Sequence, residues 1–301
     1  MKIVFAGTFA ARLAPRVSDS LSRPCDVNDR LSRSCDVDDS LSTPCDVVVC
    51  EESALVSELG DADVLVTMGF TRTMGEAAKR LRLVQVPGAG LDRIDRNAVP
   101  SGVALANAYG HEVGIAEWVL AALLMLTREL GRLDAALRRG VWKSQWAVGA
   151  EPPPPWPELA GQTLVILGYG RIGQCLARRA RAFDMSVVAL RRTPVVDGLA
   201  TVLPPEALDD VLKRADAVVI TMPLTAETRG LLGTRELALM KPTALLLNPA
   251  RAEIVDEDAL YEALAARRIA APRWTSGTAT RPPPVRARHL GDRSTVFRAS
   301  S

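Results

Sequence analysis

The stretch that decides the fold reads Thr163-Leu-Val-Ile-Leu-Gly-Tyr-Gly-Arg-Ile-Gly173. Its aliphatic first half predicts a buried strand, and the residues from Gln174 to Phe183 predict a helix that follows without a linker. A glycine-rich turn between a strand and a helix is where α/β proteins bind the phosphates of a dinucleotide. A glycine pattern carries little weight alone, but this one stands in the strand–helix context that its mechanism requires.

Each glycine of this turn has a separate task. Gly168 permits the tight bend, Gly170 lets backbone N–H groups approach a pyrophosphate, and Gly173 allows the helix to pack closely on the strand. The N-terminus of the helix then faces the phosphates with its partial positive charge. The sequence therefore predicts that six consecutive residues bind the cofactor: Gly168, Tyr169, Gly170, Arg171, Ile172 and Gly173.

Strands and helices alternate on both sides of this turn, which is typical of parallel sheets with crossover helices. Strands are expected at Lys2–Phe5, Asp46–Val49, Val64–Thr67, Leu83–Val86, Val103–Ala106, Thr163–Leu167, Ser186–Leu190, Ala217–Thr221 and Ala244–Leu247. One long helix, from about Glu112 to Arg139, separates the first five strands from the rest. The predicted fold is α/β, with two Rossmann-like lobes joined by that helix.

Composition narrows the class of protein. The chain has 301 residues and a formal net charge of +2, so its overall charge favours neither nucleic acid nor a membrane surface. The longest apolar run, Ile115 to Leu126, is shorter than the roughly 20 residues of a membrane span and predicts a buried helix. The N-terminus lacks the apolar run of a secretory signal, and the cysteines form no CxxC pair. Reduced thiols in the cytoplasm are therefore expected.

The strand after the glycine turn bears on the choice of cofactor. It ends in Arg191 and Arg192, at the place where an acidic residue would accept hydrogen bonds from the ribose of NAD. A guanidinium suits the 2′-phosphate of NADP instead, so NADP is favoured over NAD. The alternative is a solvated pair of surface arginines.

Four further segments make the chain resemble the D-isomer-specific 2-hydroxyacid dehydrogenases over nearly all of residues 1–270. They are Val86-Pro-Gly-Ala-Gly-Leu-Asp-Arg-Ile-Asp95, the segment from Asn107 through Glu117 to Arg128, Pro223-Leu-Thr-Ala-Glu-Thr228, and Met240-Lys241 with Asn248-Pro-Ala-Arg251. The resemblance implies a flavodoxin-like substrate domain over residues 1–110 and a NAD(P)-binding domain over 111–270. It also implies that a 2-keto acid is reduced by hydride from the nicotinamide.

The resemblance gives roles to residues outside the glycine turn. Arg251 is implied to be catalytic, anchoring the substrate carboxylate and polarising its carbonyl, which suits a planar guanidinium that keeps its charge. The backbone of Ala89 and Gly90 is implied to bind the same substrate. Further cofactor contacts are implied for Pro223, Thr228, Asn248 and Ala250. Without the surrounding motif, Arg251 would be interpreted as a salt-bridged arginine at the edge of the core.

The proton donor of this chemistry is missing from its usual place. Reduction of a ketone needs an acid whose pKa lies near the working pH, usually histidine. The family uses a histidine oriented by a glutamate, and both follow the catalytic arginine. The histidines here are His111, far upstream, and His289, which comes too early after Arg251; the only acidic residue after Glu262 is Asp292. The activity of the chain as written is therefore expected to be impaired.

The chain changes character at Ala271, where a basic tail without periodicity begins and runs to residue 301. A disordered tail, a nucleic-acid-binding arm and an out-of-frame translation compete as interpretations. Read two bases later, the codons from Arg273 onward can encode Leu-Asp-Val-Trp-Tyr, and family members continue here with Ala-Leu-Asp-Val. That frame offers no glutamate codon at the family's Glu-Pro position. We expect a frameshift or truncation that removes a strand and leaves a sheet edge uncovered, which sequencing the coding DNA would test.

A tandem ten-residue repeat precedes the second strand. Its copies, Ser20–Asp29, Arg30–Asp39 and Ser40–Val49, each place a cysteine before Asp-Val. Cysteines ten residues apart match no metal-ligand motif, so no metal is expected. A duplicated surface loop is favoured, because closing a longer loop costs little additional free energy.

These observations together predict a NAD(P)-dependent oxidoreductase of D-2-hydroxyacids that acts on a small 2-keto or 2-hydroxy acid. A homodimer is expected, because the helix at Ile115–Leu126 has more apolar face than one lobe needs. Nucleic acid and membranes are not expected as partners. The alternative from another class is a non-catalytic dinucleotide-binding protein that acts through partners.

Overall fold

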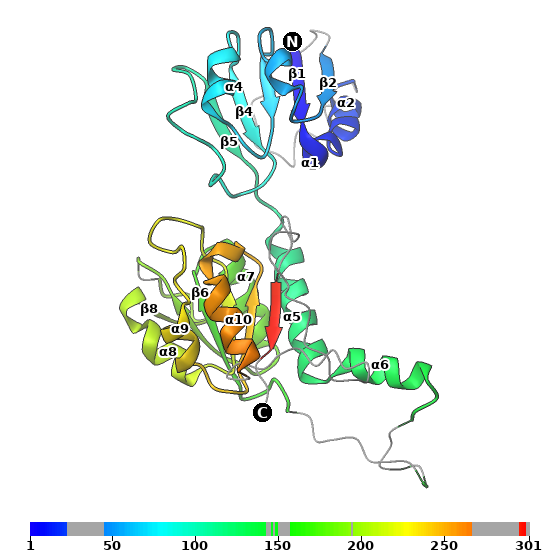
Figure 1. Cartoon of the computed structure of the whole chain (residues 1–301), viewed down its shortest axis with the longest axis vertical. Coiled ribbons are helices and arrows are strands. Elements are labelled where there is room, and N and C mark those ends of the chain that lie inside the picture. The colour runs from blue at the N-terminus through cyan, green and yellow to red at the C-terminus, as the bar shows by residue number, and fades with distance from the viewer. Residues whose placement is uncertain are drawn as a thin grey trace. The chain divides into compact units, whose positions relative to one another are not determined.

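The computed structural model describes residues 1–22, 45–142, 146, 148–149, 157–193, 195–266 and 295–298. Most of the decapeptide repeat, the expected frameshift site and His289 lie outside these residues. Contacts divide the chain into two units, Met1–Gly110 and His111–Ser301. Each unit is built on a mostly parallel sheet with helices on both faces (Figure 1).

The first unit contains a five-stranded parallel sheet, in the order β2-β1-β3-β4-β5, among its described residues. The chain starts at β1, moves to β2, and then returns to the other side of β1, which is the strand order of flavodoxin-like folds. Its elements are β1 Lys2–Ala6, α1 Gly7–Ala11, α2 Ala14–Ser22, β2 Asp46–Cys50, α3 Leu55–Glu58, β3 Val64–Val66, α4 Arg72–Ala77, β4 Leu83–Val86 and β5 Ala104–Asn107.

Strand β1 is apolar at consecutive positions because both of its faces are covered. Val4 and Ala6 pack in a buried cluster with Leu55 of α3. Phe5 packs in a separate cluster with Ala10 of α1. A parallel strand with helices on both sides has no face for polar side chains, which explains the continuous apolar run in the sequence.

The second unit contains a six-stranded sheet, in the order β11-β10-β9-β6-β7-β8, among its described residues. Its helices are α5 Glu112–Thr127, α6 Leu130–Arg138, α7 Arg171–Arg181, α8 Leu208–Arg214, α9 Thr234–Leu239 and α10 Glu257–Ala265, with short 3₁₀ turns at Pro205–Ala207 and Ala252–Ile254. Its strands are β6 Thr163–Leu167, β7 Ser186–Leu190, β8 Thr201–Leu203, β9 Ala217–Ile220, β10 Leu245–Asn248 and β11 Thr295–Arg298.

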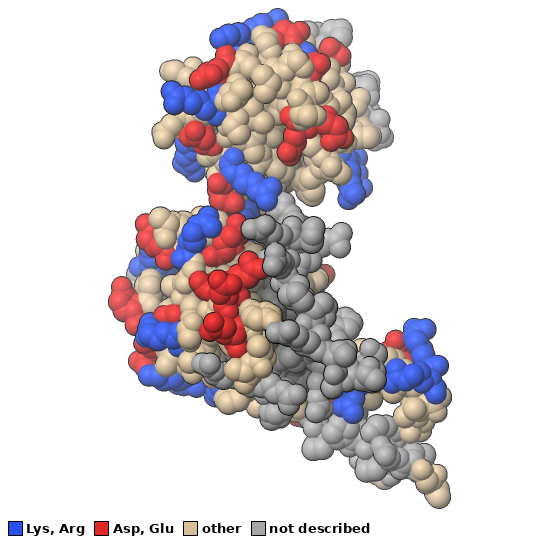
Figure 2. Space-filling view, viewed as in Figure 1, with Lys and Arg blue, Asp and Glu red and all other residues tan. Residues whose placement is uncertain are grey.

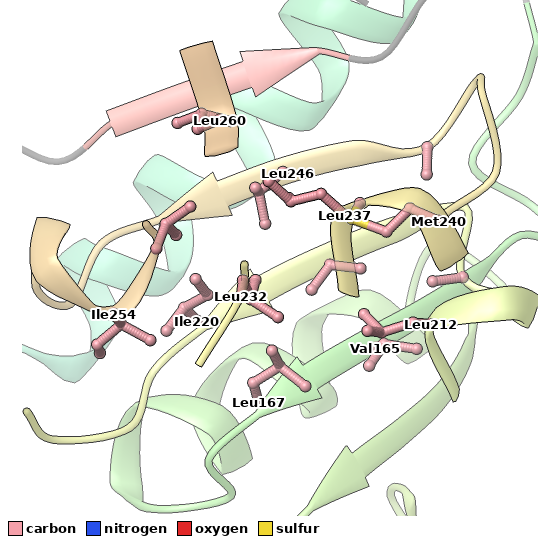
Figure 3. Close-up of a cluster of buried hydrophobic side chains, with 14 of the residues drawn as sticks. Val165, Leu167, Leu212, Ile220, Leu232, Leu237, Met240, Leu246, Ile254 and Leu260 are labelled. Carbon is pink, nitrogen blue, oxygen red and sulfur yellow. The ribbon is translucent and has the colours of Figure 1, made fainter. Parts of the chain in front are cut away.

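Two buried clusters sandwich this sheet. Val165 and Leu167 of β6 lie in the cluster that also takes in α8, α9 and α10, part of which Figure 3 shows. Leu164 and Ile166, which alternate with them, pack with α5 and α7 on the other face. Strand β6 is thus buried on both faces, and this packing fixes the point at which the glycine turn begins.

The long helix predicted from Glu112 to Arg139 is two helices in the structure. Helix α5 ends at Thr127, and Glu129 takes a left-handed conformation (φ 52°) before α6 begins. Five residues of α5 are buried, whereas α6 buries none. The break comes where the helix stops packing on the described part of its unit, which the apolar pattern alone did not reveal.

Two strands go beyond the sequence prediction. Strand β8 pairs in parallel with β7, although its three residues gave no pattern of their own. Strand β11 pairs antiparallel with β10, from Leu245 opposite Arg298 to Asn248 opposite Thr295. The expected uncovered edge at β10 is therefore wrong over these four positions, because four residues of the basic tail supply the missing backbone partners.

Acidic side chains gather over α10 on the face shown in Figure 2. Asp256 caps this helix by accepting a hydrogen bond from the Ala259 N–H at 2.8 Å, and Glu257 and Asp258 occupy its first turn. Carboxylates at this end complement the helix dipole. Of the helices in the described ranges, none has the length and apolar character to cross a membrane.

Candidate dinucleotide-binding site

The site lies at one edge of the second sheet. From β6 the chain runs first to β7 and β8 on one side and then to β9 and β10 on the other. The switch point therefore falls between β6 and β9, and α/β proteins bind ligands outside the carboxyl ends of the strands at such a point. The residues that follow these strand ends are Gly168, Arg191, Thr221 and Pro249.

The three glycines of the turn face different surroundings. Gly168 has φ +101°, and a Cβ there would lie 2.6 Å from the backbone nitrogen of Met222. A Cβ on Gly173 would lie 2.7 Å from the Gly168 carbonyl oxygen, so the helix could not approach the strand as it does. A Cβ on Gly170 would meet nothing within 4 Å. Packing within the protein requires glycine at positions 168 and 173, whereas the backbone at Gly170 faces open space.

Helix α7 begins directly behind that space. Its N-cap is Gly170, which offers no side-chain cap, and its first turn carries no acidic residue. The first N–H groups of a helix have no partner within the helix and attract anions. A helix N-terminus left uncapped beside an open glycine is suited to a pyrophosphate.

Thr221 braces the glycine turn from the neighbouring strand. Its hydroxyl donates a hydrogen bond to the Gly168 carbonyl oxygen at 2.5 Å, and its backbone N–H donates to the Leu167 carbonyl at 2.8 Å. From the sequence, Thr221 is predicted only as the last residue of a strand. Its position directly after β9, beside the glycine turn, becomes apparent only once the strand order is known.

Tyr169 is buried, with 1% of its surface exposed, and it connects the turn to the segment after β7. Its hydroxyl donates a hydrogen bond to Oδ2 of Asp197 at 2.6 Å, and its carbonyl accepts one from Nη1 of Arg191 at 3.1 Å. Burial raises the pKa of Tyr169, and the hydrogen bond to Asp197 raises it further. The hydroxyl is therefore a donor throughout the working pH range.

The two arginines after β7 are placed differently. Arg191 is half-buried and held on the Tyr169 carbonyl, whereas Arg192 is exposed. The positive charge of Arg192 helps to keep the pKa of Glu227 below its ordinary value, although the main cause is the hydrogen bond from Thr225. Arg192 is thus within electrostatic reach of the loop after β9.

That loop, Pro223–Thr228, is braced by its own side chains. The Thr228 hydroxyl donates a hydrogen bond to the Pro223 carbonyl at 2.8 Å and accepts one from the Thr225 N–H at 2.8 Å. The structure therefore uses the Thr228 hydroxyl to shape the loop at the sheet edge.

Asn248 holds the turn that carries Arg251. Only 4% of Asn248 is exposed, and its Nδ2 donates to the Arg251 carbonyl at 2.7 Å while its Oδ1 accepts from the Ala250 N–H at 3.0 Å. Arg251 is half-buried, and its Nη1 donates to the Ala250 carbonyl at 3.1 Å. The turn after β10 is thus fixed from within.

Ala89 and Gly90 lie in the first unit, after the carboxyl end of β4. The Ala89 carbonyl accepts a hydrogen bond from Nδ2 of Asn107 at 2.9 Å, and the Gly88 carbonyl accepts one from the Ala108 N–H at 3.1 Å. The last residue of β5 and the residue after it therefore anchor the carbonyl groups of this loop. Among the backbone–backbone hydrogen bonds of residues 45–142, none is donated by the N–H group of Ala89 or Gly90.

Among the residues that the structure describes, the one histidine is His111. His111 is the N-cap residue of α5 and makes no side-chain capping bond. In the described part of the chain, no three His, Cys, Asp or Glu side chains gather in a way that could hold a metal ion.

Comparisons with known proteins agree with this geometry. Residues 120–273 match the family described as D-isomer specific 2-hydroxyacid dehydrogenase, NAD binding domain. The chain is 32% identical over 227 residues to the hydroxypyruvate reductase of Thermotoga maritima, covering 73% of this chain and 70% of that protein. It is 37% identical over 218 residues to the glyoxylate reductase of Thermococcus gammatolerans, covering 70% and 65%. The TT0316 protein of Thermus thermophilus has a similar structure, with 30% identity, a TM-score of 0.68 and coverage of 88% and 78%.

Several of these relatives are longer proteins. The chain covers 41% of the D-3-phosphoglycerate dehydrogenase of Methanocaldococcus jannaschii and about 65% of the glyoxylate reductases. The family match nevertheless spans half of the chain, and the glycine turn and the segment after β10 lie within it. The chain therefore belongs to the D-isomer-specific 2-hydroxyacid dehydrogenase family.

Proposed function

We propose that the protein is a NAD(P)-dependent oxidoreductase of D-2-hydroxyacids and that it prefers NADP. The observation that carries the proposal is the open space beside Gly170, at the switch point between β6 and β9 and in front of the uncapped N-terminus of α7. The names of the relatives, glyoxylate reductase and hydroxypyruvate reductase, support a small 2-keto acid as substrate.

Each unit has a separate part in this proposal. The second unit, over residues 111–270, would bind the dinucleotide through the glycine turn, Arg191, Arg192 and the loops that contain Pro223, Thr228, Asn248 and Ala250. When bound, the nicotinamide would supply or accept the hydride. The first unit, over residues 1–110, would bind substrate through the N–H groups of Ala89 and Gly90, in a loop whose Gly88 and Ala89 carbonyls are held by Ala108 and Asn107.

Arg251 would anchor the substrate carboxylate and polarise the carbonyl that accepts the hydride. A guanidinium does both because it is planar, offers several donors and does not lose its proton. The reaction also needs a proton donor, and the sequence has no histidine in the family's position. We therefore propose that turnover is slow while cofactor binding is intact.

The test has two stages, both on the full chain. Fluorescence titration measures the Kd of NADPH and of NADH; NADH binding as tight as that of NADPH would contradict the NADP preference. Oxidation of NADPH by glyoxylate or hydroxypyruvate then measures turnover. We expect Arg251→Ala to reduce kcat/KM about 100-fold or more while leaving the Kd of NADPH within about twofold.

Arg178→Ala is a matched control, because Arg178 is an exposed arginine on α7, and it should leave kcat/KM unchanged. Binding without turnover in the wild-type protein would favour the non-catalytic alternative, a dinucleotide-binding protein that acts through partners.

A homodimer is part of the proposal. Helix α6 buries none of its residues within the described part of the chain, and 54% of Leu137 and 62% of Trp142 are exposed. A helix this short is unstable alone, so a second copy that covers its apolar side explains its presence. Light scattering should give twice the chain mass, and Leu137→Glu should give the monomer mass.

We also propose that the protein works in the cytoplasm. Cys50 and Cys175 are free thiols, as expected in a reducing compartment. Cell fractionation that places the protein with the cytoplasmic enzymes would support this.

A further inference from the structure

Tyr169 binds the last residue of β7 and the segment that follows it through its N–H, carbonyl and hydroxyl groups. Its N–H donates to the Leu190 carbonyl at 3.2 Å, its carbonyl accepts from Nη1 of Arg191 at 3.1 Å, and its hydroxyl donates to Asp197 at 2.6 Å. One residue of the glycine turn therefore fixes the end of β7, the first arginine and a later point of the same segment.

The tyrosine ring is itself immobilised. It is 1% exposed and packs in the cluster formed with Leu176 and Ala177 of α7 and Leu120 of α5. A buried tyrosine hydroxyl requires a partner, and Asp197 is that partner. The buried ring therefore fixes the position of its hydroxyl group, and the hydroxyl holds Asp197 near the glycine turn.

Asp197 uses both carboxylate oxygens in this arrangement. Oδ2 accepts from Tyr169, and Oδ1 accepts from the Leu199 N–H at 2.9 Å. Desolvation acts to raise the pKa of Asp197, yet the hydrogen bonds from Tyr169 and the backbone outweigh it and hold the pKa below its ordinary value. The negative charge is thereby bound within the segment that begins with Arg191 and Arg192.

We propose that Tyr169 and Asp197 are positioning residues that set the preference for the 2′-phosphate of NADP. By tying the segment after β7 at two points, they hold Arg191 and Arg192 in place before the cofactor arrives. Binding groups that are already ordered lose less conformational entropy on binding. This proposal rests on the proposed binding of NADP by the second unit.

The test compares two cofactors that differ only in the 2′-phosphate. The Kd values of NADPH and NADH are measured on the full chain for Tyr169→Phe, Asp197→Ala and the double variant. We expect each single variant to weaken NADPH about fivefold, the effect of losing one ordinary hydrogen bond, and to change NADH less than twofold. The double variant should be no worse than either single variant, because both remove the same interaction.

Tyr261→Phe, on the exposed side of α10, is the matched control and should leave both Kd values unchanged. Equal weakening of NADPH and NADH would mean that Tyr169 merely supports the turn and would overturn the inference, as would additive effects in the double variant. Because Asp197 is exposed, Asp197→Ala keeps the test valid if Tyr169→Phe fails to fold. Wild-type protein that binds neither cofactor would contradict the proposed function itself, before any variant is compared.

Discussion

At the scale of single residues, the glycine turn separates what the fold needs from what the ligand needs. Gly168 is required by its positive φ and by the nearness of the Met222 backbone, and Gly173 by the nearness of the Gly168 carbonyl. Gly170 has φ −95°, which any residue adopts, and open space beside it. Packing within the protein therefore requires Gly168 and Gly173 but not Gly170, and a bound pyrophosphate would account for the glycine at position 170.

This difference yields a prediction for two alanine variants. Gly170→Ala should change the free energy of unfolding by less than about 1 kcal/mol, because alanine restricts the unfolded chain but is a poorer N-cap than glycine. It should weaken NADPH at least tenfold, because the methyl group fills the space of the pyrophosphate. Gly168→Ala should cost about 3 kcal/mol or more, through backbone strain and the clash with Met222.

Thermal unfolding and fluorescence titration on the same samples check both values. A Gly170→Ala variant that binds NADPH as well as the wild type would show that the pyrophosphate does not lie at this turn.

The residues that bind the turn to its neighbours could not be predicted from the sequence. The glycine spacing is a local signal. It predicted the strand with its observed bounds, and it predicted the helix at Gln174–Phe183, whereas α7 spans Arg171–Arg181. Thr221 and Asp197 act through hydrogen bonds to Gly168 and Tyr169, at separations in the chain that only the strand order and the loop path define. No short pattern marks such a threonine or aspartate among the others.

Among the strands and helices, both sheets use an aspartate carboxylate to connect the starts of two paired strands. Asp63 directly precedes β3, and its Oδ2 accepts from the N–H of Lys2, the first residue of β1, at 2.8 Å. Asp216 directly precedes β9, and its Oδ2 accepts from the N–H of Thr163, the first residue of β6, at 2.8 Å. Each carboxylate also binds a basic side chain, so it joins the starts of two paired strands.

The pKa of Asp63 predicts how acid affects the first unit. The N–H of Lys2 is the main cause that holds this pKa below its ordinary value of 3.8, and Arg80 adds to it. A lowered folded-state pKa means that the stabilisation is complete above about pH 4 and is lost as the pH falls through the folded value. Asp63→Asn should therefore be less stable than the wild type by about 1 to 2 kcal/mol at pH 7.

That difference in stability should shrink as the pH falls toward 2, because the wild-type carboxylate becomes protonated. Urea unfolding at several pH values measures it. Asp210→Asn is the control, since the Asp210 side chain is 76% exposed, and it should change little. A gap between wild type and Asp63→Asn that stays constant with pH would contradict the assignment.

The sequence predicted whether a segment is a helix or a strand better than it predicted the residues at which the segment begins and ends. Short apolar runs predicted Leu83–Val86, Thr163–Leu167 and Ser186–Leu190 with their observed bounds, because strands covered on both faces leave few polar positions. Apolar residues recur at helical spacing on both sides of Glu129, so the pattern could not show where packing on the unit ends. Strand β11 depends on a distant partner, β10, and has no local signal.

At the scale of the whole molecule, the chain contains two α/β units of related construction with different strand orders. In both, the chain begins at an interior strand, and the carboxyl ends of neighbouring strands carry the expected ligand-binding loops. The alternation of strands and helices predicted this plan, because only a parallel sheet with crossovers satisfies it. Which loops bind which ligand depends on side chains, and the family resemblance supplied that part.

The decapeptide repeat is an insertion between α2 and β2, and the five described strands of the first unit's sheet include none of residues 21–40. Helix α2 ends at Ser22 and β2 begins at Asp46, and deletion of residues 21–40 would replace Leu21-Ser22 with the identical pair Leu41-Ser42. The connection would shrink to Thr43, Pro44 and Cys45, a usual length between a helix and a strand. A shorter loop costs less entropy to close, so the deletion should raise the free energy of unfolding by about 1 kcal/mol. It should leave the Kd of NADPH unchanged, since the proposed cofactor site lies in the second unit. Loss of more than about 2 kcal/mol in urea unfolding would show instead that the repeat has contacts on which the first unit depends.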